Sequence, residues 1–349
     1  MKISHLFLAI ILLLSMPSKA QKGINFIKTG NFNVAIATAK KQNKLLFMEV
    51  YAPDCHICNA FKGTFAQPQV GTLYNAKFVN FQLDIRNPEN QNLLKKLKIN
   101  INATPTFIFM DPNTLQIVGA KIFGERENSV INVNSIAQKA ANPAENAQNY
   151  AKRLKGGDKN LQFLLNYAEY ARIVGDTTSN ILAFNEFAKT LNPGQYTSQS
   201  TFNAIQMVMM NNNNALFDYF ITHIPAYEKI YEANPVRMSY ENIFQIVLTS
   251  SQANKLSVSD IQKIKSQMTK AGLDASSIQR RMWMVESSLL FKQKKASQAI
   301  QVIEKLLAVL PNAPGPKEYQ YLCDYVNGKT KDKKALAYAK SHWCKFGMK

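Results

Sequence analysis

The spacing of apolar residues changes near residue 143, and this change most constrains the fold. Upstream of it, four short segments have the apolar runs or the alternation of β-strands, and segments with helical spacing separate them. The predicted strands span residues 45–51, 77–85, 106–111 and 117–123, and the predicted helices span residues 31–43, 56–74, 88–98 and 127–141. Strands that alternate with helices predict an α/β sandwich.

The rest of the chain has helical spacing only, interrupted by short turn segments. Residues 280–313 resemble part of the tetratricopeptide pattern, with Trp283 near the start, Ala299 sixteen residues later and Pro311 twelve residues after that. The Gly and Tyr of that pattern's first helix are absent. We therefore predict an all-α helical-repeat domain, an α-solenoid of irregular hairpins, over residues 143–349.

The first twenty residues have the composition of a secretory signal peptide. Lys2 supplies a positive start, and 6-LFLAIILLL-14 supplies an apolar centre. In 18-SKA-20, Ser18 and Ala20 are small residues at the two positions that a signal peptidase reads. The apolar run is shorter than the roughly 20 residues that a membrane-spanning helix needs. We predict a signal peptide at residues 1–20, a periplasmic or secreted mature chain from Gln21, and no transmembrane segment after cleavage.

The chain is strongly basic, with 42 Lys and Arg against 23 Asp and Glu and a formal net charge of +19. Export argues against nucleic acid as the partner of this charge. The excess of lysine predicts either a solvated surface or a basic face for acidic clients or an anionic envelope surface.

The stretch 48-MEVYAPDCHICNAF-61 holds two cysteines, Cys55 and Cys58, directly after an apolar run. A structural zinc site needs four ligands. His56 offers one, but the rest would have to come from the far domain, since no second Cys-x-x-Cys exists. A permanent disulfide here would close almost no loop and gain little chain entropy. A redox pair therefore fits best, although the other two interpretations stay open at this stage.

The physical case for a redox pair is specific. The amino end of a helix favours a thiolate through its free N–H groups and its dipole, so Cys55 is the candidate nucleophile. Cys58 lies one helical turn further on and can resolve a mixed disulfide on Cys55. Glu49 is a lone acid in the preceding apolar strand; if buried, it would have a raised pKa and could relay a proton for Cys58. The alternative for Glu49 is a strand-end side chain in solvent.

The pair Thr104-Pro105 precedes the predicted strand at residues 106–111. A proline that opens a strand is ordinary. A cis-proline loop at this place would in addition leave a backbone edge free to pair with a client peptide.

With these features in place, residues 31–124 resemble the thioredoxin superfamily, and most of all its exported thioredoxin-like branch. The resemblance rests on 39-AKKQNKLLFMEVYAPDCHIC-58, 77-KFVNFQLD-84 and 103-ATPTFIFMDP-112. It implies a thioredoxin fold in which Cys55 attacks, Cys58 resolves and Pro105 is cis. It also puts Glu49 at the position of the family's buried acid, which is usually Asp.

The resemblance further implies a client-binding surface and a reaction without a cofactor. The expected client contacts are Thr104, Pro105, His56 and Ile57. This chain departs from the family pattern in two ways, since Asp54 replaces the usual Trp and His56-Ile57 replace Gly-Pro. Asp54 disfavours a thiolate on Cys55 and a protonated His56 favours it, so the direction of the redox chemistry stays open. The resemblance associates a Thr before the cis-Pro, here Thr104, with isomerases.

The remaining cysteines, Cys323 and Cys344, are expected not to be bonded. In a regular antiparallel helix pair with a turn near residues 328–332, they would differ by about 12 Å in height. A disulfide needs Cα atoms within about 7 Å. Cys323 is expected instead to fill a small-residue position against Ala335.

The sequence thus predicts a signal peptide at residues 1–20, a thioredoxin-like domain at 21–142 and a helical-repeat domain at 143–349. The predicted function is exported thiol–disulfide oxidoreduction by Cys55 and Cys58. The expected partners are protein or peptide clients bearing disulfides and an envelope electron donor or acceptor, and not nucleic acid. The alternatives are a non-catalytic binding scaffold and, as a minor one, a thiol-dependent peroxidase or stress sensor.

Overall fold

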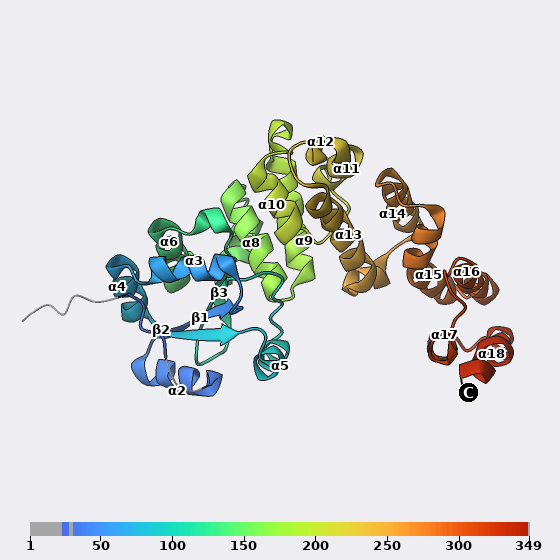
Figure 1. Cartoon of the computed structure of the whole chain (residues 1–349), viewed down its shortest axis with the longest axis horizontal. Coiled ribbons are helices and arrows are strands. Elements are labelled where there is room, and N and C mark those ends of the chain that lie inside the picture. Colours follow the sequence, from blue (N-terminus) through green and yellow to red (C-terminus); the bar gives the residue numbers. More distant parts are fainter. Residues whose placement is uncertain (1–22, 28–30, 348–349) are drawn as a thin grey trace, which may run out of the picture. The chain divides into compact units, whose positions relative to one another are not determined.

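The structure is a computed structural model that describes residues 23–27 and 31–347. The predicted signal peptide therefore lies outside the described residues. The chain divides into two compact units, the first ending at Ser179 and the second beginning at Asn180 (Figure 1). Among the described residues, no helix combines the length and the apolar character needed to cross a membrane.

The first unit is built around one four-stranded sheet with the order β2-β1-β3-β4. The strands are β1 (Leu45–Tyr51), β2 (Phe78–Asp84), β3 (Thr106–Met110) and β4 (Ile117–Ile122). Strand β1 pairs in parallel with β2 and antiparallel with β3, and β4 pairs antiparallel with β3. All four predicted strands are present, and β4 forms one edge of the sheet.

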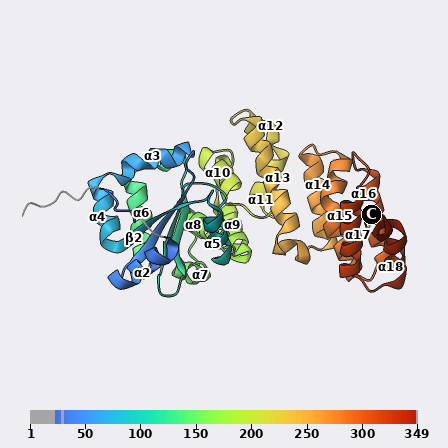
Figure 2. The same cartoon turned by 60° about the horizontal axis from the view of Figure 1, so that its bottom comes forward.

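Helices cover both faces of this sheet (Figures 1 and 2). They are α2 (Phe32–Gln42), α3 (His56–Phe65), α4 (Pro68–Lys77), α5 (Pro88–Lys96) and α6 (Val130–Ala141). Strand β1 shows why its sequence is almost wholly apolar: Leu46 and Met48 face the core under α2 and α5, whereas Phe47 faces the core under α3, α4 and α6. A central strand that is buried on both faces needs apolar residues at its odd and its even positions.

Pro68 divides the predicted helix at residues 56–74 into α3 and α4. It occupies the first position of α4, where its missing N–H costs no hydrogen bond. Helix α4 approaches the segment before β1 closely, because a Cβ atom on Gly71 would overlap the carbonyl group of Gly23. Glycine is required at this contact.

The first unit continues beyond the expected boundary at residue 142. It includes α7 (Tyr150–Lys155) and α8 (Leu161–Ile173), and α9 (Thr177–Thr190) then leads into the second unit. Helix α8 packs on β4, and its Ile173 is fully buried in the core that also holds α2. The end of the strand signals marked the end of the sheet, not the end of the unit that surrounds it.

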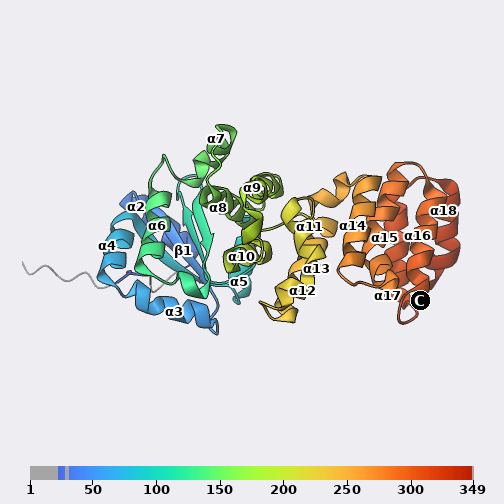
Figure 3. The ribbon, with the colours of Figure 1, turned by 90° about the horizontal axis from the view of Figure 1, so that it is seen from above.

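The second unit is helical throughout its described residues. Its helices are α10 (Gln199–Met207), α11 (Ala215–Thr222), α12 (Ile224–Glu228), α13 (Ala233–Thr249), α14 (Val258–Lys270), α15 (Ala275–Lys292), α16 (Ala296–Ala308), α17 (Pro316–Lys329), α18 (Lys333–Ala339) and α19 (Lys345–Gly347), with a π-helix over Lys340–Cys344. Helices α14, α15 and α16 pack side by side (Figure 3). An α/β domain followed by an all-helical region is thus confirmed.

The expectation for Cys323 and Cys344 was wrong, because the two residues form a disulfide with their Cα atoms 5.0 Å apart. The expectation assumed two regular α-helices that are level at the turn. Instead, Cys344 is the last residue of a π-helix that begins at Lys340, and Gly347 packs directly against Gln320. Gly347 lies three residues after Cys344, and Gln320 lies three residues before Cys323. Because Gly347 and Gln320 are level along the two antiparallel segments, Cys344 and Cys323 are level as well, and the predicted difference in height is absent.

Candidate redox site at the amino end of α3

Cys55 and Cys58 lie where strand β1 gives way to helix α3. Cys55 is the N-cap residue of α3, and its Sγ lies 3.1 Å from the backbone N–H of Cys58, which donates to it. The two cysteines are joined in a disulfide with their Cα atoms 5.3 Å apart. A sulfur that accepts from the first turn of a helix is placed where a negative charge is favoured.

The two sulfurs differ in access. Cys55 is partly exposed, whereas Cys58 is buried at 5% exposure. A client disulfide can therefore reach Cys55 before it can reach Cys58. An attacking thiol needs such access and a resolving thiol does not; the two roles themselves stay a prediction for Cys55 and Cys58.

The loop before β3 lies beside Cys55. The Thr104–Pro105 peptide bond is cis, and the carbonyl oxygen of Thr104 is 3.4 Å from the Sγ of Cys55. Pro105 is buried and Thr104 partly exposed. The backbone N–H of Phe123, just after β4, donates to the carbonyl oxygen of Pro105 at 3.0 Å. The structure thus brings together the predicted nucleophile and the predicted client-binding loop.

Glu49 is buried in the middle of β1, at 2% exposure. Its parity in β1 is that of Phe47, so it faces the side of the sheet that α3 covers. Its Oε2 accepts a hydrogen bond from the side-chain amide of Gln82 at 2.7 Å. Burial raises the pKa of Glu49 to about 7, with the Gln82 hydrogen bond and the charge of Lys62 opposing the rise. A carboxyl with this pKa can take up and release a proton near neutral pH.

Charged and polar residues surround the exposed side of the disulfide. Asp54 forms an ion pair with Arg86, which follows β2, at 3.2 Å. Both side chains are mostly exposed, so the pair contributes little to stability, but Arg86 offsets the negative charge beside Cys55. His56 is exposed and Ile57 partly buried, and both lie in the first turn of α3.

Sequence reasoning missed Gln82, Arg86 and Lys62 as residues of this site. Gln82 lies opposite Glu49 because of the parallel register between β1 and β2. In the sequence it is only the polar member of an alternating strand. Nothing in the sequence alone gives that register, so no signal there identifies Gln82 as the partner of the buried acid.

Among the described residues, no group of three or more His, Cys, Asp or Glu side chains is arranged to hold a metal ion. Cys55 and Cys58 are paired with each other in the structure.

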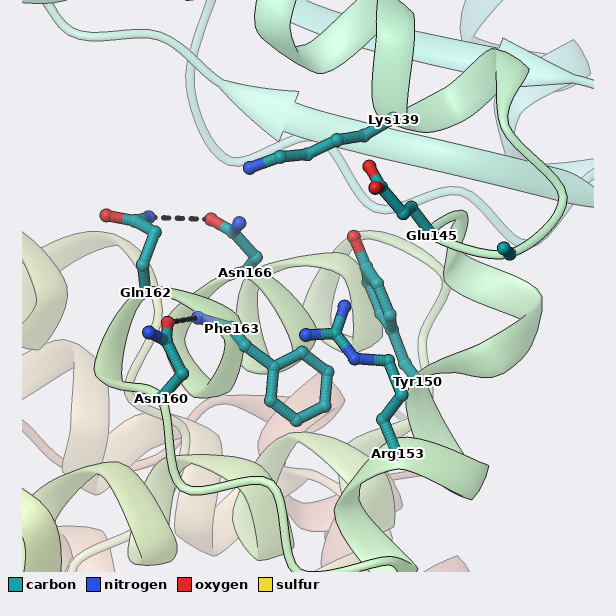
Figure 4. A pocket seen from close by; sticks show the side chains of 9 residues that line it. Lys139, Glu145, Tyr150, Arg153, Asn160, Gln162, Phe163 and Asn166 are labelled. Carbon is teal, nitrogen blue, oxygen red and sulfur yellow. Dashed lines mark hydrogen bonds between the residues drawn. The ribbon is translucent and has the colours of Figure 1, made fainter.

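A pocket of about 440 Å³ lies away from the dithiol, between the end of α6 and the helices α7 and α8 (Figure 4). Arg153 lies over the ring of Phe163 and forms an ion pair with Asp158 at 2.7 Å. The ring of Tyr150 packs on Tyr170, which binds the first residue of β4. The guanidinium group of Arg153 is thus already paired. None of the residues that line this pocket belongs to the redox site.

Comparisons with known proteins agree with this geometry. A family described as "Thioredoxin-like" matches residues 27–112. The thiol:disulfide interchange protein DsbD of Yersinia pestis (strain Pestoides F) is 32% identical over 108 residues, which are 30% of this chain and 18% of DsbD. The same protein of Yersinia pestis bv. Antiqua (strain Antiqua) gives the same values. The chain thus spans about a fifth of the length of these relatives.

A solved structure of a thioredoxin from Thermus thermophilus is 22% identical, with a TM-score of 0.29 over 34% of this chain and 90% of that chain. By the family match, the chain carries a thioredoxin-like domain at residues 27–112, similar to part of DsbD, and a large helical region follows it.

Proposed function

We propose that this protein is an exported thiol–disulfide oxidoreductase that acts on protein or peptide disulfides. The observation that carries the proposal is the Cys55–Cys58 disulfide at the amino end of α3, with Cys55 beside the Thr104–Pro105 loop. A partly exposed sulfur next to a backbone edge suits attack on an extended client. The similarity to a part of DsbD, whose name describes thiol:disulfide interchange, supports the same chemistry.

The reaction in the reducing direction begins with the Cys55 thiolate. It attacks one sulfur of a client disulfide; the client S–S bond breaks, a mixed disulfide forms on Cys55, and the first client thiolate takes a proton. Glu49 then accepts the proton of Cys58, whose thiolate attacks the Sγ of Cys55. The second client thiolate leaves and is protonated. The client has gained two electrons and two protons, and the Cys55–Cys58 disulfide has formed.

The direction in the cell depends on the reduction potential of the pair. Thiol trapping across a series of glutathione redox buffers measures this potential. A value near −270 mV would assign a reductase supplied by an electron donor, and a value near −120 mV an oxidant. Export, a periplasmic or secreted location and the use of the second unit as a helical-repeat surface for clients or a redox partner are parts of this proposal.

The trapping variant Cys58→Ala tests the mechanism. It retains the nucleophile and removes the resolving thiol, so mixed disulfides with clients should accumulate on Cys55. The matched control is the double variant Cys55→Ala/Cys58→Ala, which should trap nothing. If Cys58→Ala folds, keeps a reactive Cys55 thiol and still traps nothing, the proposed mechanism is wrong. Insulin reduction by the wild-type protein separates this function from a scaffold, which would show none.

A further inference from the structure

Helix α8 contacts the chain upstream of Pro105 and, downstream of it, the end of strand β4, which pairs with the residue after Pro105. This helix lies outside the thioredoxin-like match. On the upstream side, the backbone N–H of Asn100 donates to the carbonyl oxygen of Ile173 at 2.7 Å. On the downstream side, the backbone N–H of Ile122 donates to Oε1 of Glu169. Asn100 begins the segment at residues 100–105, here called the Pro105 loop.

The downstream contact is directly linked to Pro105. Ile122 is the last residue of β4 and lies opposite Thr106 in β3, the residue that follows Pro105. The next residue, Phe123, donates its N–H to the carbonyl oxygen of Pro105. Glu169 therefore holds the last residue of β4 in place, and the next residue, Phe123, binds the carbonyl oxygen of Pro105.

Glu169 is held in a defined place by its own partners. It is buried at 5% exposure, and its Oε2 is 3.8 Å from Nζ of Lys121 in β4. Lys121 is bound on its other side by Glu127 at 2.9 Å, and Glu127 also accepts from the backbone N–H of Gly124. A buried carboxylate needs such partners to be tolerated, and they leave it little freedom to move.

We propose that α8 is part of the client-binding apparatus and that Glu169 is a positioning residue for the Pro105 loop. In this arrangement the backbone edge at Thr104 and Pro105 is ordered before a client arrives, which lowers the entropy that binding must overcome. The ligand class is an extended peptide segment around a client cysteine. This inference rests on the proposed function and adds a residue outside the dithiol site.

Three variants of the full chain separate positioning from general stability. Glu169→Ala removes the acceptor for Ile122, while Lys121 keeps Glu127 as a partner. Glu169→Gln keeps a side-chain oxygen that can accept from Ile122 and should restore most of the function. Tyr170→Phe is the matched control, because it removes a hydrogen bond from the same helix to the carbonyl oxygen of Ile117, at the opposite end of β4.

Each reduced variant is assayed with insulin and with 5,5′-dithiobis(2-nitrobenzoate), a small disulfide that needs no peptide edge. For Glu169→Ala we expect kcat/KM for insulin to fall on the order of tenfold, mainly through KM. A misplacement of about 1 Å can cost about a hundredfold, and the loop here keeps its bond from Asn100 to Ile173. The rate with the small disulfide should stay within about twofold. Tyr170→Phe should leave both rates within about twofold.

Amide hydrogen exchange provides a readout that does not depend on activity. Glu169→Ala should speed exchange in the Pro105 loop and at Phe123, and Tyr170→Phe should not. The inference is overturned if exchange there is unchanged, or if Glu169→Ala lowers both rates equally. A wild-type protein that is inactive on both disulfides would instead refute the proposed function, and exchange would still decide whether Glu169 orders the loop.

Discussion

Replacing Glu49 with Gln should stabilise the first unit above pH 7 and leave its stability unchanged below about pH 4. The carboxyl of Glu49 has a pKa of about 7 in the folded protein, against 4.5 as the ordinary value, because it is buried. Between these two pH values the unfolded chain has released a proton that the folded chain still holds. Folding stability therefore falls as the pH rises through this window, and the fall is complete above pH 7.

The size of the effect follows from the two pKa values. The gap between 4.5 and about 7 corresponds to about 3 kcal/mol, the cost of ionising the carboxyl in its buried position. Glutamine carries no charge at any pH and can still accept the hydrogen bond from Gln82. The difference in unfolding free energy between the variant and the wild type should thus grow from near zero in acid to about 3 kcal/mol in mild base.

The assay must report on the correct unit. Both tryptophans, Trp283 and Trp343, lie in the second unit, so their fluorescence does not follow the sheet. Urea titrations of the oxidised protein at several pH values, each followed by a short exchange pulse at one fixed pH, report the opening of β1 directly. A stability difference that does not change with pH would refute the reasoning. The same variant should slow the release of mixed disulfides by about a hundredfold, since it lacks the proton acceptor.

Two further predictions concern stability. Replacing Cys323 and Cys344 together with Ala should lower the unfolding free energy of the second unit by about 3 kcal/mol, because the unfolded chain loses a cross-link between residues 21 positions apart. Tryptophan fluorescence in urea measures this loss, since both tryptophans lie in that unit. Gly71→Ala should destabilise the first unit by about 2 kcal/mol, because the added methyl group meets backbone that cannot move aside. The control Gly63→Ala, in open space on α3, should stabilise that unit by about 0.5–1 kcal/mol.

Local patterns were sufficient to predict the first unit's sheet and its dithiol. The run at residues 45–51 is apolar at both parities, and only a central strand with helices on both faces buries such a run completely. Cys55 and Cys58 follow it at the start of a helical pattern. These signals lie within a few residues of each other in the chain, so their interpretation needs no long-range contact.

Contacts between segments that are distant in the chain could not be predicted from the sequence. Gln82 reaches the site through the pairing of β1 with β2, and Arg86 reaches it from the loop after β2. Neither the strand register nor the path of that loop can be predicted from one sequence. The disulfide between Cys323 and Cys344 was missed for a similar reason. Its formation depends on where a helix leaves regular α geometry, and the π-helix at residues 340–344 has no clear sequence signature.

Glu49 and Glu169 share one sequence signal, a lone acid in an apolar segment, yet they are suited to different tasks. The side chain of Glu49 accepts a hydrogen bond from the neutral amide of Gln82, and the charge of Lys62 opposes the rise of its pKa less than that bond does. Its carboxyl can therefore change its charge near neutral pH, as proton transfer requires. Burial also raises the pKa of Glu169, but Lys121 and a backbone N–H oppose the rise and fix both oxygens. An acid with fixed oxygens serves to hold neighbouring backbone in place, so the partner decides whether a buried acid exchanges protons or orders structure.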